Sequence, residues 1–175
     1  ADRRIVARCT GRVEYGPRAL GNRSILFHAG DPTANDWLNK RLRRSEFMPF
    51  APATLAERAP QAYVGVSRAA TAAEFMTVCF DVTPGFRERC PAVVHVDGTA
   101  RPQLVTERGN PSFHRLLCEY ERRTGVASVV NTSFNIHEEP IVCTPEDALR
   151  AFSTASLEVL ALGDHLVWRP DAEPP

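Results

Sequence analysis

Arginines lie in one stretch of the sequence that is too rich in glycine and proline for an ordinary helix or strand. The segment GRVEYGPRALGNRS, residues 11–24, combines three Gly, one Pro and three Arg. Glycines let the backbone approach a ligand, and successive N–H groups in such a turn can form an anion nest. Arg18 follows Pro17 directly, so a rigid turn would hold its guanidinium. The loop predicts phosphate or carboxylate binding by Arg18, with Arg23 as a further binding candidate; a surface turn with structural salt bridges is the alternative.

A second basic segment, NKRLRRSEFMPFAP, covers residues 39–52. On a helix, Lys40 and Arg44 are separated by four positions and share one face. This pair is the candidate for a second phosphate clamp. The alternative is a solvated helix end, where cations are favoured by the helix dipole.

Two further segments carry polar side chains that could bind a ligand or take part in a reaction. HVDGTARPQLV, residues 95–105, places His95, Asp97 and Arg101 at alternate positions. His95 and Asp97 are spaced as two metal ligands, but a third is not evident, so we expect a hydrogen bond between them and no metal site.

NTSFN, residues 131–135, ends an apolar run with Asn131 and Ser133. Polar groups at the carboxyl end of a strand are where open sheets bind ligands. The nucleophile-elbow pattern of hydrolases is absent, so we do not expect Ser133 to attack a substrate. Separated cations, one hydroxyl and one amide, with no evident general base, suit phosphoryl or nucleotidyl transfer by charge stabilisation.

The elements that must position these groups mix strands, hairpins and helices. Strands are expected at 4–9, 23–30, 48–55, 73–82 and 126–133, with one or two more near the C-terminus. A hairpin is expected over 91–106 around Asp97-Gly98. Helices are expected after Asp31-Pro32-Thr33 up to Leu42, over 110–125, and after Thr144, with a short one in the loop 57–72. This pattern predicts an α/β or α+β fold with a mixed, twisted sheet.

Composition excludes several classes of protein. The chain has 175 residues, 43% hydrophobic content and a formal net charge of zero. A broad nucleic-acid or membrane surface would need a basic excess. The five cysteines contain no CxxC pair, so neither a disulfide framework nor a zinc site is predicted, and buried thiols in a cytoplasmic protein are expected. The start at Ala1 and the Pro-rich end suggest a C-terminal domain of a longer protein.

Four segments together resemble a known family. GRVEYGPRALGNRSIL, EFMPFAP, HVDGTARPQLV and NTSFNIHEEPIVCTPEDALRAF occur in the order and spacing of the C-terminal domain of NodU/CmcH-type carbamoyltransferases. The resemblance covers about residues 5–168. It implies a YrdC-like domain over 1–170, an open twisted mixed sheet with flanking helices and a concave basic face, followed by a polar tail at 171–175. In the family a Kae1-like domain, absent from this chain, precedes it.

The same resemblance implies a chemistry. Carbamoyl phosphate and ATP, with Mg²⁺ carried mostly by the nucleotide, give carbamoyl-adenylate and pyrophosphate. The Kae1-like domain then passes the carbamoyl group to a hydroxyl of a sugar, antibiotic or Nod factor. Arg18, Arg101 and Ser133 match residues that hold the phosphate and carbamoyl oxygens, and the backbone of Met76 would face the carbamoyl group. Arg44 matches an arginine of the family's basic segment.

The sequence departs from the family pattern at two places. The position of the usual phosphate-binding lysine holds Leu42, and that of a second cation holds Met48, so Lys40 or Arg43 would have to substitute. NIHEEP replaces a commoner form with Gly before Glu-Pro, which is expected to bring His137 and Glu138 near the mouth of the site. The departures at Leu42 and Met48 leave open a regulatory module that binds nucleotide or phosphate without turnover. The resemblance to the wider YrdC fold leaves open RNA-linked threonylcarbamoyl-adenylate chemistry.

Overall fold

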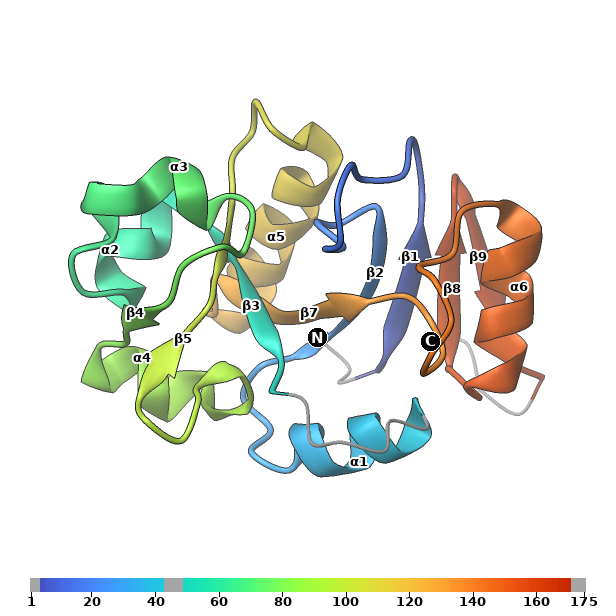
Figure 1. Cartoon of the computed structure of the whole chain (residues 1–175), viewed down its shortest axis with the longest axis horizontal. Coiled ribbons are helices and arrows are strands. Elements are labelled where there is room, and N and C mark those ends of the chain that lie inside the picture. The colour runs from blue at the N-terminus through green and yellow to red at the C-terminus, as the bar shows by residue number, and fades with distance from the viewer. Residues whose placement is uncertain (1–3, 43–48, 171–175) are drawn as a thin grey trace.

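The protein is built on a seven-stranded mixed sheet (Figure 1). The computed structural model describes residues 4–42 and 49–170. The strand order is β6-β3-β7-β2-β1-β8-β9. The bounds are β1 Val6–Cys9, β2 Arg23–His28, β3 Ala51–Leu55, β6 Gln103–Val105, β7 Ser128–Ser133, β8 Val159–Leu162 and β9 His165–Trp168. A separate two-stranded sheet pairs β4 (Phe80–Asp81) with β5 (Thr99–Ala100).

Helices cover both faces of the large sheet. The longer ones are α1 (Ala34–Arg41), α5 (Pro111–Thr124) and α6 (Pro145–Thr154). Short helical turns join β3 to β6, namely η1 (Ala56–Arg58), α2 (Ala59–Ala62), η2 (Val66–Ala69), α3 (Ala70–Ala73), α4 (Pro84–Arg89) and η3 (Pro91–Val93). The mixed α/β class expected from the sequence is confirmed.

Successive side chains along the strands point to opposite faces of the sheet, and this produces two hydrophobic cores, one on each face. In β2, Ile25 and Phe27 belong to the larger core, whereas Leu26 between them packs on the opposite face. That opposite face is covered by Phe113 and Leu117 of α5. The larger core takes side chains from α1 and α6, so the sheet is the central layer, as period-two burial requires.

Local capping explains why two helices lie where the sequence predicts them. In α5, the Asn110 side chain accepts from the Phe113 N–H, and Gly125 ends the helix with a φ of +72°. In α6, Thr144 and Asp147 form a reciprocal capping box, with Pro145 in the first turn. These capping residues lie next to the helix ends in the sequence, so they can be recognised without knowledge of tertiary contacts.

Two strand predictions are wrong. Of the run 73–82, only Phe80–Asp81 pairs as a strand, because the chain leaves α3 through a turn in which Met76 has a φ of +55°. The hairpin expected over 91–106 has its turn at Asp97-Gly98, but residues 91–93 form a 3₁₀ turn and β5 pairs with β4 instead. None of the described helices is long and apolar enough to cross a bilayer.

Candidate functional site

Five of the predicted site residues line one small cavity. Its volume is about 70 Å³, and it is enclosed by 17–19, 49–51, Met76, Arg101 and 131–133. Arg18, Met76, Arg101, Asn131 and Ser133 are therefore brought together from segments far apart in the sequence. None of the described residues lining the cavity is acidic.

Strand pairing explains this convergence. β7 runs antiparallel to both of its neighbours, β2 and β3. Ser133 at the end of β7 faces Ser24 at the start of β2, and Asn131 faces Ala51 at the start of β3. The glycine-rich loop before β2 and the segment before β3 must therefore both arrive near the carboxyl end of β7, and residues of all three segments line the cavity.

Two guanidinium groups meet at the cavity without a compensating carboxylate. The pKa of Arg101 is lowered, first by its burial and then by the positive charge of Arg18. Neither arginine forms an ion pair with any residue in the described part of the chain. The Arg101 Nε is buried and has no hydrogen-bond partner there. Like charges held together in this way leave a site that an anion would stabilise.

The polar side chains of β7 offer a second set of contacts. The Ser133 hydroxyl donates to Asn135 Oδ1 at 2.6 Å, which leaves the lone pairs of its oxygen available to a donor. The Asn131 amide donates to Gln103 Oε1 at 2.8 Å and to the Ala19 carbonyl at 3.2 Å. The buried Oδ1 of Asn131 has no partner among the described residues. An N–H donor on a ligand would satisfy it.

Met76 places backbone at the cavity in an unusual conformation. It is buried, and its φ of +55° lies in the left-handed region that non-glycine residues rarely adopt. Residues held in such conformations concentrate at ligand sites, where surrounding structure over-determines them.

The loop that carries Arg18 is fixed by residues that sequence reasoning missed. One carboxylate oxygen of Glu14 accepts from three backbone N–H groups, those of Leu20 and Asn22 at 2.7 Å and Arg23 at 3.2 Å. Gln103 donates to the Leu20 carbonyl at 2.7 Å. Glu14 is visible in the sequence inside the loop, but its partners are backbone atoms, which leave no mark in the residue pattern.

Arg23 is expected from the sequence to bind a ligand, but the structure does not place it in the lining of this cavity or of a second, larger hollow. It is 5% exposed, and its guanidinium donates to four backbone carbonyls, those of Thr10, Gly11, Asn22 and Cys143. The hydrogen bonds of the Arg23 guanidinium therefore connect the glycine-rich loop to the segment before α6. A buried arginine and a ligand-binding arginine look alike in sequence, because both are guanidinium groups in a glycine-rich turn.

The basic segment contributes little that the structure describes. Lys40 is exposed on α1 and lies outside the cavity lining. Arg44, Arg43 and Met48 fall outside the described residues. Leu42, which stands where the family has its phosphate-binding lysine, is fully buried in the larger core. That position therefore supplies packing and no cation.

The structure also bears on two further expectations. His95 and Asp97 do not bond to each other: His95 Nδ1 lies 3.1 Å from Thr99 Oγ1, and Asp97 Oδ1 accepts from both the backbone N–H and the hydroxyl of Thr99. The expected hydrogen bond between His95 and Asp97 is therefore wrong, because both side chains have Thr99 as their partner within this tight turn. His137 and Glu138 do not line the cavity.

A larger hollow lies beyond the glycine-rich loop. Its volume is about 580 Å³, within the range of small-molecule sites. Glu14, Leu20 and Asn22 of the loop line it, as does Gln103, whose side chain also bonds Asn131 of the small cavity. Two aromatic side chains at its edge, Tyr15 and Phe75, are exposed. Residues of the glycine-rich loop thus line both hollows. The hydrogen bond between Gln103 and Asn131 connects the lining of one hollow to that of the other.

Comparison with known proteins identifies relatives of this chain. The chain is 38% identical to the nodulation protein NolNO of Sinorhizobium fredii over 99% of its length and 26% of that protein. It is 40% identical to an uncharacterized protein of Methanocaldococcus jannaschii over 94% of its length and 27% of that protein. It is also 40% identical to nodulation protein U of Azorhizobium caulinodans over 77% of its length and 23% of that protein.

A solved structure shares the fold. Full-length HypF, crystallised in its phosphate- and nucleotide-bound form, superposes with a TM-score of 0.61 at 19% identity, over 92% of this chain and 23% of that one. The chain spans about a quarter of the length of the relatives named above. The model of the carbamoyltransferase C-terminus matches residues 1–169. The chain therefore belongs to the carbamoyltransferase C-terminus family.

Proposed function

We propose that this chain is the domain of an ATP-dependent O-carbamoyltransferase that binds carbamoyl phosphate and ATP and forms carbamoyl-adenylate. In this proposal a second, Kae1-like domain of the same cytoplasmic polypeptide transfers the carbamoyl group to a hydroxyl of a small-molecule acceptor. The observation that carries the proposal is the meeting of Arg18 and Arg101 with Asn131 and Ser133 on one cavity whose described lining has no acidic residue.

Each group of the cavity suits one part of carbamoyl phosphate. Guanidinium groups bind phosphate oxygens through paired N–H donors, so Arg18 and Arg101 are assigned to the phosphate. The unpartnered Oδ1 of Asn131 and the lone pairs of Ser133 suit the carbamoyl NH₂. The backbone of Met76, held at a positive φ, is assigned to the carbamoyl group on the opposite side.

The balance of atoms defines what the site has to stabilise. Carbamoyl phosphate, ATP and one water give carbamoyl-adenylate, pyrophosphate and inorganic phosphate. The carbamoyl–phosphate bond breaks with water and releases inorganic phosphate, and the carbamate then bonds the α-phosphate of ATP as pyrophosphate leaves. Negative charge develops on phosphate oxygens at both steps, and guanidinium groups at the cavity would stabilise it without a protein nucleophile. The described lining of the small cavity offers no carboxylate for Mg²⁺, whereas the larger hollow is lined by Glu14 and Glu74. In this proposal the metal is carried mostly by the phosphates of the nucleotide.

The larger hollow is the proposed place of the nucleotide. It has the volume that a nucleoside triphosphate needs, and it is joined to the small cavity through Gln103. Exposed aromatic rings at its edge, Tyr15 and Phe75, offer stacking surfaces for a base.

The proposal is tested by carbamoyl-phosphate-dependent exchange between ATP and pyrophosphate in the full-length enzyme. We expect Arg18→Ala and Arg101→Ala each to abolish exchange, because each removes a charge-assisted contact. Arg12→Ala is the matched control, since Arg12 is an exposed arginine of the same loop that lines neither hollow. Exchange at the wild-type rate in both cavity variants would refute the assignment.

The regulatory-module alternative has a distinct outcome. The burial of Leu42 in the core, where the family has a phosphate-binding lysine, is the observation that favours it. A module would bind ATP and carbamoyl phosphate in a calorimeter yet support no exchange beside its partner domain. Binding together with exchange excludes the module.

A further inference from the structure

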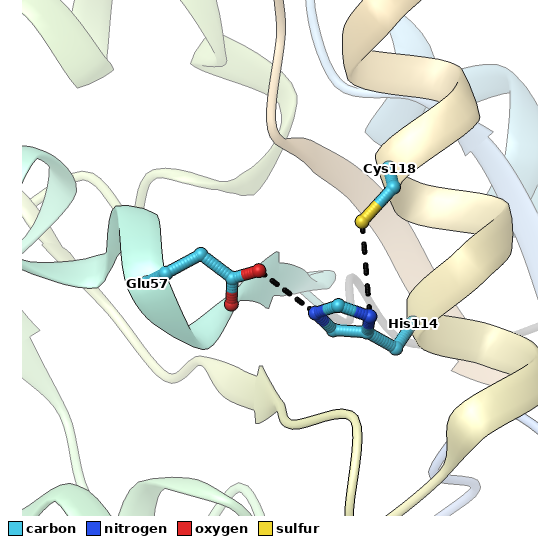
Figure 2. A group of neighbouring side chains, drawn as sticks. All are labelled: Glu57, His114 and Cys118. Carbon is cyan, nitrogen blue, oxygen red and sulfur yellow. Dashed lines mark hydrogen bonds and ion pairs between the residues drawn. The ribbon is translucent and has the colours of Figure 1, made fainter.

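Three side chains with metal-binding atoms gather on the outer surface of α5. His114 and Cys118 are four positions apart on that helix, and Glu57 reaches them from η1 (Figure 2). His114 Nε2 lies 2.8 Å from Glu57 Oε1, and His114 Nδ1 lies 3.7 Å from Cys118 Sγ. One ligand atom from each residue lies within 4.8 Å of the others. None of the three lines either hollow of the proposed carbamoyl site.

The two elements that carry this cluster, α5 and η1, are held by packing against the sheet and by an ion pair. On the inner side of α5, Phe113 and Leu117 are fully buried against the sheet. Arg58 of η1 forms a 2.7 Å ion pair with Glu121 of α5, which joins the two elements beside the cluster. A site assembled on braced helical elements is held more accurately than one on a loop.

The hydrogen bonds select one tautomer of His114. An ionised carboxylate can only accept, so the bond to Glu57 requires a proton on Nε2. In a neutral imidazole the lone pair then lies on Nδ1, the atom that faces the sulfur of Cys118. Figure 2 shows the ring between the two partners in this order. A carboxylate that orients a histidine from its outer nitrogen is the usual companion of a zinc-bound imidazole.

The electrostatic surroundings distinguish a metal ligand from a nucleophile. The pKa of the Cys118 thiol is raised, first by partial burial and then by the negative charges of Glu57, Glu121 and Glu107. A nucleophilic cysteine needs a positive environment that stabilises its thiolate. The three carboxylates near Cys118 disfavour an isolated thiolate, and the positive charge of Arg58 offsets part of that effect.

We propose that Cys118 Sγ and His114 Nδ1 bind a divalent cation of the zinc type, with Glu57 as the positioning residue that holds the imidazole through Nε2–H. Zinc–sulfur and zinc–nitrogen bonds of ordinary length at a tetrahedral angle place the two ligand atoms about 3.6 Å apart, and the observed separation is 3.7 Å. On binding, the thiol loses its proton to solvent and the sulfur–metal bond forms. Water fills the remaining positions. The spacing of the five cysteines did not indicate this site, because Glu57 is distant in sequence and the cysteine pairs with a histidine.

Cobalt and zinc titrations of the chain test the proposal. Cobalt is expected to bind one equivalent and to give the charge-transfer absorption of a cobalt–thiolate bond, and zinc is expected to displace it. Cys118→Ser and His114→Gln should remove the absorption and lower zinc affinity at least 100-fold. Glu57→Gln should lower the affinity about 10- to 100-fold while keeping the absorption, as expected for a positioning residue.

Cys79→Ser is the matched control, since Cys79 is an exposed cysteine that lies outside the cluster. It should bind cobalt as the parent chain does. Circular dichroism without metal should be unchanged in Cys118→Ser, whose side chain is exposed. The proposal is overturned by a folded chain without the cobalt–thiolate absorption, or by equal zinc affinity in the parent chain and Cys118→Ser. Neither result bears on the carbamoyl site, which has its own exchange assay.

Discussion

Glu138 holds a backbone conformation that glycine adopts at lower cost. Its φ is +64°, and it occupies the position before Glu139-Pro140 at which the resembling family more commonly has glycine. A left-handed φ brings the Cβ of any L residue close to the following carbonyl oxygen. The departure noted in the sequence therefore carries a conformational strain.

Glu138→Gly is expected to raise the free energy of unfolding by about 0.5–1 kcal/mol, since relief of this strain exceeds the added chain entropy of glycine in the unfolded state. Denaturant unfolding measures the change. Glu139→Gly is the control, because Glu139 has no positive φ and contacts Arg150 at 3.8 Å. A Glu138→Gly chain less stable than its parent would contradict the account.

At the scale of elements, the glycine-rich loop is held against α5 by close packing. Gly21 has a φ of +116°, and a Cβ built on it would stand 2.8 Å from Cγ of the buried Phe113. Gly16 in the same loop has a φ of +114° but nothing within 4 Å of such a Cβ. The two glycines share a conformational requirement and differ in the space around them.

Alanine substitutions at these positions should separate the two effects. Both variants lose stability through φ, and Gly21→Ala should lose about 1–3 kcal/mol more because its methyl group collides with the ring. Gly21→Ala should also weaken binding of carbamoyl phosphate, since the loop carrying Arg18 must shift. Thermal unfolding measures the stability of each variant, and calorimetry measures its binding of carbamoyl phosphate. Equal stability of the two variants would show that the loop does not depend on this contact.

The capping box of α6 predicts a pH dependence. The carboxylate of Asp147 accepts from the backbone N–H groups of Thr144 and Cys143, which lower its pKa from 3.8. A lowered pKa contributes stability above the ordinary value, and that contribution is lost as the pH falls through the lower value of the folded state.

Asp147→Asn should therefore be less stable than the parent chain at about pH 6, and the difference should be smaller at about pH 2. Denaturant unfolding at the two pH values measures it. Glu146→Gln is the control for loss of a charge in the same turn. A difference that is unchanged at low pH would exclude the carboxylate as its source.

Prediction from sequence succeeded where the signals were local. Asn110, Gly125 and Thr144 define the ends of α5 and α6 from adjacent residues. The run 73–82 failed because apolar content alone does not reveal the turn at Met76. The same limit applies to the site. The motifs predict Arg18, Arg101 and Ser133, and the structure brings these three residues to one cavity. Arg23 does not line it, and the carbonyl partners of Arg23 become visible only once the loop is folded.

At the scale of the whole molecule, the antiparallel pairing of one central strand with two neighbours creates the proposed site. The segments that precede β2 and β3 both arrive near the end of β7, which lies much later in the sequence. Two arginines without described ion-pair partners are held there by the fold itself. The stability of the rest of the sheet offsets the repulsion between them, and a bound anion would relieve it.

The most direct measurement of this account is calorimetric binding of carbamoyl phosphate to the parent chain and to Arg18→Ala, Arg101→Ala and Arg12→Ala. Loss of a charge-assisted contact costs about 1.5–3 kcal/mol, roughly a 10- to 150-fold loss of affinity. We predict that loss for the two arginines at the cavity and parental affinity for Arg12→Ala. Equal affinity in all four chains would contradict the claim that the cavity binds the phosphate.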